Sequence, residues 1–237
     1  MAKYKSVLLK LSGESLSGNT QETFDPKMLS HYAEEIKSIV AEGIKVGVVL
    51  GGGNIFRGIQ GQGAGFDRIQ GDYMGMLATV INSLALKGAL AGIGLKAEVL
   101  SGIPIASLCE KMSSHKALEL QNQGYVVIMA GGTGNPFFTT DSAAALRAIE
   151  TRADVLLKGT RVDGVYTADP EKDPMAKKIN SITFADAISR NLRVMDLTAF
   201  TLCMENKMPI IVFDVAQKGI LADIVLHGRM PGTIVSV

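Results

Sequence analysis

Residues 44–53 have the sequence IKVGVVLGGG, an apolar run followed by glycines that indicates the class of fold. Val, Ile and Leu predominate in residues 44–50, and three glycines follow at once. A strand that is apolar along nearly its whole length is typical of a parallel sheet covered by helices on both faces. The same pattern recurs in residues 6–11 (SVLLKL) and 125–130 (YVVIMA), which also run into glycine-containing loops. We therefore expect several buried strands that each end in a loop.

Helical segments are expected between these strands. Asp25 and Pro26 have the N-cap and first-position chemistry that begins a helix, and Gly43 ends it. Further helices are expected at residues 72–92, 142–149, 184–189, 198–206 and 220–227, further strands at 97–100, 154–158, 210–213 and 232–237, and a mobile loop at 59–71. This alternation predicts a mostly parallel sheet in one compact unit, whose two lobes meet near residue 150. Ligands of such sheets bind outside the carboxyl ends of the strands, where the glycines lie.

The composition disfavours several classes of function. The chain of 237 residues has a formal net charge of +1, 5% aromatic residues and no Trp, so neither a basic stripe nor stacking platforms for a nucleic acid are expected. Cys109 and Cys203 are the two cysteines, without a CxxC pattern, so we expect reduced thiols rather than a disulfide or a metal site. No signal peptide and no membrane segment is expected, which indicates a cytoplasmic protein. His31, His115 and His227 are expected on the surface of helices.

Two segments with possible phosphate chemistry follow the first two strands. Lys10 lies inside an apolar strand and precedes Ser12-Gly13, where it could meet a phosphate; the alternative is a lysine that extends to solvent. Gly51–Gly52–Gly53–Asn54, with Arg57 nearby, could turn backbone N–H groups toward phosphate oxygens. The alternative is a tight strand-to-helix turn. A Gly-Lys dipeptide is missing from the sequence, so a Walker A loop is excluded.

Residues 131–141 (GGTGNPFFTTD) form a third and more unusual segment. It combines backbone donors and hydroxyl groups with two rings, Phe137 and Phe138, that could flank a base. Thr139 or Thr140 could cap the following helix, which leaves its first N–H groups free for an anion. The alternative is a structural loop whose phenylalanines belong to the core.

Residues 158–170 (KGTRVDGVYTADP) form the fourth segment. Asp163 and Gly164 are predicted to form a hairpin turn, and Lys158 again ends an apolar strand. Tyr166 and Asp169 offer a ring and a carboxylate that suit an adenosine. The alternative is an ordinary hairpin.

Together these segments resemble the amino acid kinase superfamily, and most closely its bacterial uridylate kinase family. Residues 158–170 resemble a stretch found across the superfamily. The closer resemblance lies in KLSGE at 10–14, VGVVLGGGNIFRG at 46–58, GDYMGMLAT at 71–79, GTGNPFFTTDSAA at 132–144 and MDLTAF at 195–200. It implies a single domain, 1–237, with the three-layer α/β/α sandwich of that superfamily, usually assembled as a homohexamer.

The resemblance also implies an activity and residue roles. The family transfers the γ-phosphoryl group of ATP, accompanied by Mg²⁺, to UMP in pyrimidine nucleotide biosynthesis. The implied catalytic set is Lys10, Lys158 and Asp141. The implied ATP contacts are Lys10, Leu11, Ser12, Gly13, Gly53, Arg57, Thr160, Tyr166 and Asp169. The implied UMP contacts are Gly52, Asp72, Thr133, Gly134, Asn135, Pro136, Phe137, Phe138, Thr139 and Thr140. Asp72 would accept hydrogen bonds from the ribose, or else cap its helix. The UMP site falls in a lobe of about residues 1–150 and the adenosine site in a lobe of about residues 151–237.

One region departs from the family pattern. A glycine-rich GFGID-like stretch, linked in the family to GTP activation, is replaced by QETFD at 21–25, and Ala91 stands where a histidine is often found. Lys87 and Lys96 keep positive charge nearby. GTP activation is therefore in doubt, UTP inhibition is implied by the family, and the catalytic residues are unaffected.

Two other functions fit the same segments. One is a phosphotransferase of the same superfamily that acts on an amino acid carboxylate or a carbamate. The other is a nucleotide-binding regulator without turnover, which would keep the glycine loops but would not need both lysines.

Overall fold

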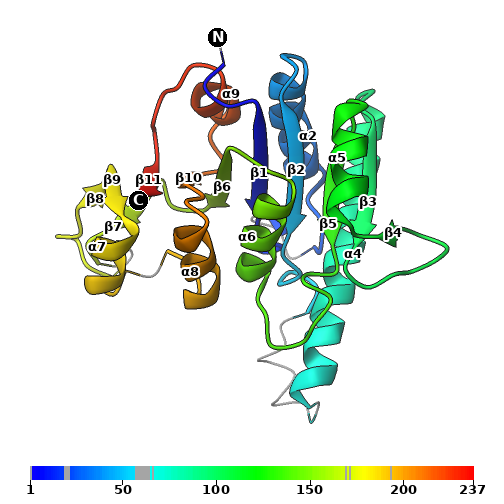
Figure 1. Ribbon diagram of the computed structural model, residues 1–237, viewed down its shortest axis with the longest axis horizontal. Helices are drawn as coiled ribbons and strands as arrows, with labels where there is room; N and C mark the ends of the chain where they lie inside the picture. The colour runs from blue at the N-terminus through cyan, green and yellow to red at the C-terminus, as the bar shows by residue number, and fades with distance from the viewer. Residues whose placement is uncertain are drawn as a thin grey trace.

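The computed structural model describes residues 2–18, 22–56, 65, 67–168, 170, 172–192 and 194–237. These residues contain a nine-stranded sheet with the strand order β4-β3-β5-β2-β1-β6-β10-β11-β9 (Figure 1). The strands are β1 Ser6–Leu11, β2 Lys45–Leu50, β3 Ala97–Ser101, β4 Glu110–Lys111, β5 Val126–Ala130, β6 Val155–Thr160, β9 Ser181–Thr183, β10 Ile210–Asp214 and β11 Thr233–Ser236. Neighbouring strands are parallel except for β10 and β11, which confirms the expected sheet.

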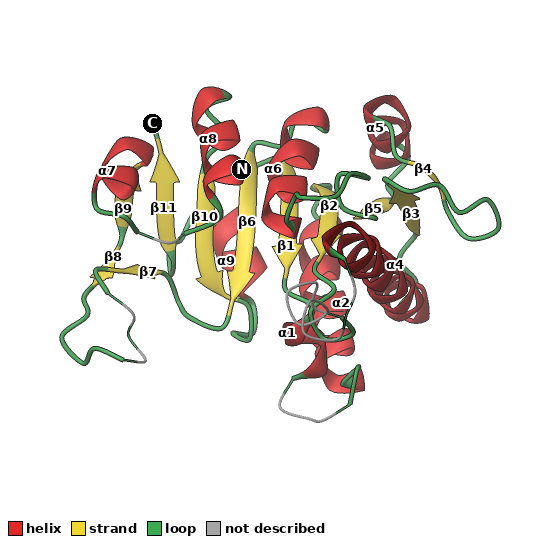
Figure 2. Cartoon of the chain, turned by 90° about the horizontal axis from the view of Figure 1, so that it is seen from below, coloured by secondary structure: helices red, strands yellow, loops and turns green. Residues whose placement is uncertain are grey.

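Helices cover both faces of the sheet and give three layers (Figure 2). One face carries α2 (Pro26–Val40), α4 (Arg68–Gly92) and α9 (Ile220–Val225), and the other carries α5 (Ser114–Asn122), α6 (Thr140–Glu150), α7 (Phe184–Ser189) and α8 (Leu197–Glu205). The short helix α1 (Glu14–Ser17) follows β1. A small antiparallel pair, β7 (Val165–Tyr166) and β8 (Lys178–Ile179), stands apart from the main sheet.

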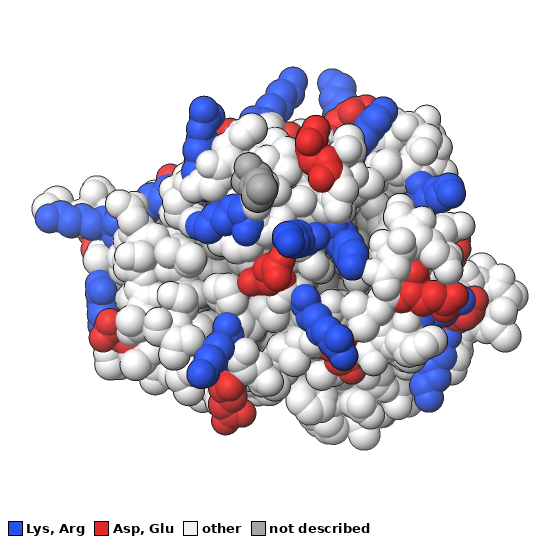
Figure 3. Space-filling view, turned by 45° about the horizontal axis from the view of Figure 1, so that its top comes forward, with Lys and Arg blue, Asp and Glu red and all other residues white. Residues whose placement is uncertain are grey.

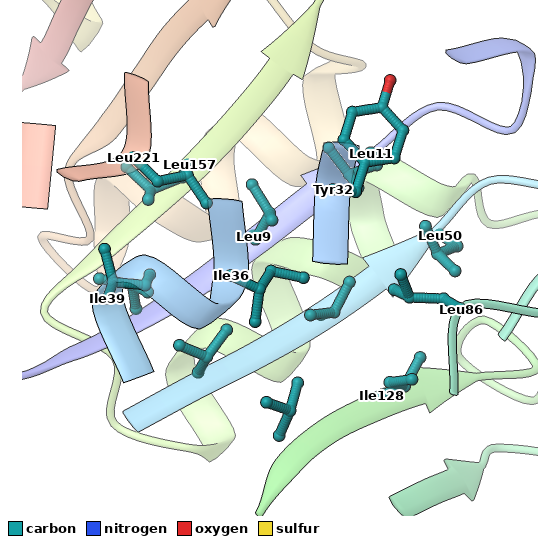
Figure 4. Close-up of a cluster of buried hydrophobic side chains, with 14 of the residues drawn as sticks. Leu9, Leu11, Tyr32, Ile36, Ile39, Leu50, Leu86, Ile128, Leu157 and Leu221 are labelled. Atoms are coloured by element: carbon teal, nitrogen blue, oxygen red, sulfur yellow. The ribbon is translucent and has the colours of Figure 1, made fainter. Parts of the chain in front are cut away.

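The core is divided by the sheet into two clusters because successive strand residues point to opposite faces. Leu9 and Leu11 pack toward α2 and α9, whereas Leu8 packs toward α6. On the first face, Ile36 of α2 and Leu221 of α9 join them (Figure 4). These strands are buried on both sides, which is why their sequences show apolar runs instead of alternation.

Several element boundaries differ from the sequence-based expectation. The helix expected to begin at Asp72 begins at Arg68, because the Asp67 side chain caps it by accepting a 3.0 Å hydrogen bond from the Gln70 N–H. Asp72 therefore lies inside α4, and the idea that it caps this helix is wrong. Part of the expected 59–71 loop is helical, while residues 57–64 and 66 lie outside the described residues.

The turn expected at Asp163 and Gly164 is not a hairpin turn between neighbouring strands. β7 pairs with β8 instead of β6, so residues 161–164 connect the main sheet to the small one. The sequence-based reading also missed α1, α5, β4, β8 and β9. Of the three histidines expected on the surface, His115 and His227 are exposed, whereas His31 is only partly exposed and its Nε2 lies 2.9 Å from the Val215 carbonyl oxygen.

Helix α4 is long and strongly apolar. Within the described residues it is the one helix that could cross a membrane by length and composition, with a mean hydropathy of 1.4 over its most apolar window. Val80, Leu86 and Leu90 are buried in the core below the sheet, which accounts for part of this apolar character. The helix packs against β3 and β5.

Candidate active site

The loops at the carboxyl ends of four adjacent strands, β5, β2, β1 and β6, gather at the edge of the sheet where α4 begins (Figure 1). The glycine segments 51–53 and 131–134 follow β2 and β5, and Lys10 and Lys158 lie near the ends of β1 and β6. Parallel order therefore brings three of the sequence segments singled out above, and the beginning of the fourth, to one place.

Asp141 bridges the two lysines. Its Oδ1 lies 2.8 Å from Lys10 Nζ and its Oδ2 lies 2.6 Å from Lys158 Nζ, and all three side chains are at most 15% exposed. Lys158 Nζ also donates a 2.7 Å hydrogen bond to the Val194 carbonyl oxygen. Asp141 lies in the first turn of α6, where the helix dipole favours a carboxylate.

Burial and neighbouring charges shift the pKa values of Asp141 and Lys158 in opposite directions. Burial alone would raise the pKa of Asp141, but the ammonium groups of Lys10 and Lys158 outweigh it and hold that pKa below its ordinary value. Burial lowers the pKa of Lys158, and the Asp141 carboxylate opposes this shift. The cluster thus holds two buried cations beside a single anion. The remaining positive charge favours binding of a further anion.

The glycine triplet after β2 packs against the turn after β1. A Cβ added to Gly13 would lie 2.5 Å from Asn54 Oδ1 and 2.7 Å from both the Gly51 oxygen and the Gly53 nitrogen. Only glycine at position 13 permits this approach. The segments expected to contact ATP, Lys10 to Gly13 and Gly53, therefore form one continuous backbone surface.

A cavity of about 250 Å³ lies between the start of α4 and the loop after β5. Seven of the ten residues expected to hold UMP line it: Gly52, Asp72, Thr133, Asn135, Phe138, Thr139 and Thr140. Gly134, Pro136 and Phe137 are not among the lining residues. Phe56, Gly71, Gly75, Met76, Thr79 and Gly132 also line the cavity, and residue-by-residue reasoning did not single them out. The GDYMGMLAT motif was the signal that could have found most of them.

Asp72 holds one wall of this cavity. Its carboxylate accepts a 2.8 Å hydrogen bond from the Phe137 N–H and two from Arg68 Nε, one turn earlier in α4. Phe137 has φ 72° and is 64% exposed, with the Arg68 guanidinium 5.8 Å from its ring centroid. Phe137 and Phe138 are therefore not core residues.

The end of this loop is capped and anchored. Thr139 Oγ1 accepts hydrogen bonds from the Asp141 and Ser142 N–H groups, so Thr139 is the N-cap of α6. It also donates to Asp196, which accepts a further 3.0 Å bond from Ser142 Oγ and caps α8. The MDLTAF segment thus supports the start of α6, the helix that carries Asp141.

A second cavity, of about 510 Å³, lies beside β6 and β7. Two of the expected ATP contacts, Thr160 and Tyr166, line it with the predicted catalytic residue Lys158; the other lining residues are Val162, Gly164, Val165, Thr167, Ala168, Pro170, Arg190, Asn191, Leu192, Val194 and Val212. Lys10 to Gly13 and Gly53 are not among its lining residues, and Gly53 lines the smaller cavity instead. The Tyr166 hydroxyl donates a 2.6 Å hydrogen bond to Asp163, which lowers the pKa of that carboxyl and raises the pKa of Tyr166. The predicted contacts Arg57 and Asp169 lie outside the described residues.

On the face shown in Figure 3, Lys and Arg side chains are interspersed with Asp and Glu. Among the residues that the structure describes, no group of three or more His, Cys, Asp or Glu side chains could hold a metal ion. Both cysteines are buried and free.

Comparison with known families defines the class of protein. Residues 5–214 match the amino acid kinase family, and the chain belongs to this family. The match spans the sheet edge, both cavities and the lysine pair.

Similar individual proteins show which group within the amino acid kinase family the chain resembles. The chain is 57% identical over 235 residues to a uridylate kinase from Bacteroides thetaiotaomicron, covering 99% of each protein, and 56% identical over 236 residues to one from Porphyromonas gingivalis, covering 100% of this chain and 98% of that protein. The crystal structure of UMP kinase from Bacillus anthracis superposes with a TM-score of 0.95 at 40% identity, over 98% of this chain and 96% of that one. The crystal structure of UMP kinase from Ureaplasma parvum superposes with a TM-score of 0.93 at 38% identity, over 99% of this chain and 100% of that one. These relatives group the chain with the uridylate kinases of the family.

Proposed function

We propose that this protein is a phosphotransferase that reversibly moves the γ-phosphoryl group of ATP to UMP, giving ADP and UDP. The observation that carries the proposal is the lysine pair bridged by Asp141 between two cavities. Thr140 lines the smaller cavity and immediately precedes Asp141, while Lys158 lines the larger one. The names of the relatives supply the acceptor, UMP, and the lining of the smaller cavity by seven of the ten residues expected to hold UMP supports binding there.

The chemistry needs no protein base. The second pKa of a phosphate monoester is about 6, so the acceptor oxygen of UMP is already ionised at neutral pH. That oxygen forms a bond to the γ-phosphorus, the bond from the γ-phosphorus to the bridging oxygen breaks, and ADP leaves with the electron pair. The task of the protein is to align two polyanions and to stabilise the transferred charge.

The buried cations suit this task. Lys10 and Lys158 would contact the transferring group from two sides, and Asp141 would orient them without taking the proton. The Gly53 N–H would bind a β- or γ-phosphate oxygen. The expectation that Gly51 shares this role is wrong, because its N–H already donates a 2.9 Å hydrogen bond to the Leu11 carbonyl oxygen. Thr160 and Tyr166 would hold the adenosine, with Arg57 and Asp169 as further predicted contacts.

The acceptor would lie along the smaller cavity. Gly52 would meet its phosphate and Asp72 its ribose hydroxyls, with the run from Thr133 to Thr140 around the base. UMP would thus bind in a lobe of about residues 1–150, and adenosine in a lobe of about residues 151–237.

Mg²⁺ would enter with ATP. Because the described residues offer no cluster of ligating side chains, its ligands would be phosphate oxygens and water, as is usual for this ion with nucleotides. When bound, Mg²⁺ neutralises charge on the β- and γ-phosphates.

We further propose a cytoplasmic homohexamer. Ile69, Tyr73, Leu77 and Ile81 recur every four residues on one face of α4, and each is 42–48% exposed. Contiguous apolar residues on a surface are typical of a contact between proteins, which supports self-association through α4. The buried, unpaired cysteines suit a reducing compartment.

The test is a coupled assay of ADP release with Mg-ATP. UMP, CMP, dTMP, aspartate and glutamate are offered in parallel, each with and without GTP, and UTP is added to the UMP reaction. We expect turnover with UMP alone; UTP should inhibit, and the GTP arm reports whether a chain with QETFD at 21–25 is still activated. Turnover with an amino acid, or with no acceptor, would overturn the proposal.

A further inference from the structure

Asn82 is a fully buried polar residue of α4 that the chemistry above does not use. Its exposed fraction is 0%, and it lies beneath the glycine triplet that follows β2. Its Nδ2 donates a 2.6 Å hydrogen bond to the Gly51 carbonyl oxygen and a 2.8 Å bond to Asn54 Oδ1. Its Oδ1 accepts a 3.2 Å bond from Asn54 Nδ2. A buried amide that uses both donors in this way is strongly oriented, because leaving either unpaired costs about 1–3 kcal/mol.

The orientation of the Gly51–Gly52 peptide follows from this contact. The described residues contain no cis peptide bond, so the carbonyl of Gly51 and the N–H of Gly52 point in opposite directions. Because the carbonyl faces Asn82 and α4, the Gly52 N–H faces away from that amide. Gly52 itself lines the smaller cavity. Within the described residues, no protein acceptor takes this N–H.

Asn82 also fixes the far end of the loop. Its partner Asn54 donates a 2.9 Å hydrogen bond to the Thr23 carbonyl oxygen, so Asn54 is held on two sides. Asn54 Oδ1 lies at the position that a Gly13 side chain would need. The amide pair therefore joins the loop after β2 to α4 and to the turn after β1.

We propose that Asn82 is a positioning residue for phosphoryl transfer, which acts by holding the Gly51–Gly52 peptide so that the Gly52 N–H is presented to a nucleotide phosphate. The inference rests on the proposed function, because it assigns a phosphate to the cavity that Gly52 lines. Asn82 touches neither nucleotide in this scheme and acts through the loop.

The variants are Asn82→Asp and Asn82→Ala. Asp has the size of Asn and keeps its acceptor oxygen, but a carboxylate cannot donate a hydrogen bond to the Gly51 carbonyl. The carbonyl oxygen therefore loses its donor and is repelled by the negative carboxylate. Ala removes both contacts and leaves a small cavity. The matched control is Ser83→Ala, because Ser83 is equally buried in the same helix but its hydroxyl donates to Thr79 within the helix.

We expect kcat with UMP to fall roughly 10- to 100-fold in both Asn82 variants, somewhat less than for direct loss of a transition-state donor. KM for ATP should change less than about threefold, and the control should stay within about twofold of the wild type in kcat. Thermal unfolding identifies variants that fail to fold. A folded Asn82 variant with wild-type kcat would overturn the inference.

Crystal structures of the wild type and of the better-folded Asn82 variant test the loop directly. We expect the Gly51–Gly52 peptide to rotate in the variant and to keep its orientation in Ser83→Ala. An unrotated peptide would overturn the inference even if UMP turnover were established. Conversely, a rotated peptide in a protein that does not phosphorylate UMP would locate the failure in the proposed function and not in the role of Asn82 in the loop.

Discussion

Lys10 and Lys158 are register partners on the neighbouring parallel strands β1 and β6. Partners in a parallel pair point to the same face, with their strands about 4.8 Å apart, so the fold places two cations side by side. The Asp141 carboxylate between them offsets this repulsion. The arrangement concentrates positive charge where two negatively charged nucleotides would have to meet.

Replacing either lysine tests this arrangement. Lys10→Ala and Lys158→Ala should each lower kcat by on the order of 10²–10³, by analogy with the loss of one donor to transition-state charge. Steady-state assays with saturating UMP and ATP measure the effect. Lys116→Ala is the control, since Lys116 pairs with Glu119 on the surface and should retain wild-type kcat. Near-normal turnover in both lysine variants would refute the mechanism.

Removing the anion should change the pH dependence. In wild type the Asp141 carboxylate opposes the burial that lowers the pKa of Lys158, so Asp141→Asn should lower that pKa further. The alkaline fall of kcat should therefore begin at a lower pH in Asp141→Asn than in the wild type. Asp223→Asn, which removes a surface partner of Arg229, should leave the profile unchanged. Coincident alkaline limbs for the wild type and Asp141→Asn would contradict the assignment.

The stability that Asp141 contributes to the folded protein should be lost only at acid pH. Because the pKa of Asp141 in the folded protein lies below its ordinary 3.8, its stabilising contribution is complete above that value and is lost only as the pH falls through the folded-state pKa. The bridge itself should thus survive acidification to about pH 5.

Asp72 is expected to act on the acceptor and not on ATP. Asp72→Asn weakens the hold on the Phe137 N–H and the pair with Arg68, so KM for UMP should rise about tenfold, equivalent to about 1.4 kcal/mol, with KM for ATP unchanged. Asp67→Asn is a matched control on the same helix, because Asn caps a helix about as well as Asp. Equal effects of the two substitutions on KM would point to helix stability as the cause.

The apolar face of α4 predicts an assembly defect. Leu77→Glu places a charge in the middle of the exposed stripe, so the oligomer should dissociate to a smaller species at equal concentration. Light scattering coupled to gel filtration measures the mass. Ala91→Glu, at an exposed position near the end of the same helix, should leave the assembly intact. An unchanged mass for Leu77→Glu would exclude α4 as the contact.

The sequence was informative where one local pattern carries the signal. Apolar runs that end in glycine identified the central strands, and lysines inside such runs drew attention to Lys10 and Lys158. The structure brings these lysines together with Asp141, although their catalytic roles stay predictions. The GTGNPFFTTD segment was rightly separated from the core, since both of its phenylalanines are exposed.

Contacts that depend on how helices pack were not accessible in the same way. Asn82 and Arg147 look like ordinary helix residues, yet Asn82 binds the Gly51 carbonyl and Arg147 donates a 3.1 Å bond to the Gly132 carbonyl. Nothing in their neighbouring sequence marks these partners, which lie 31 and 15 positions away. Likewise, β7 and β8 are two-residue strands, too short for any periodicity, so their pairing depends on tertiary structure.

The adjacency of β1 and β6 also has a consequence for the nascent chain during its synthesis on the ribosome. β1 emerges first, yet one of its two edges pairs with a strand that is synthesised almost 150 residues later. Until then the nascent chain has an open strand edge in the middle of its future sheet, which is a template for pairing with the wrong chain. Lys10 lies in β1, and a charged side chain in a strand with an open edge disfavours pairing with another chain. The residue proposed for catalysis would thus protect the chain before there is any substrate to bind.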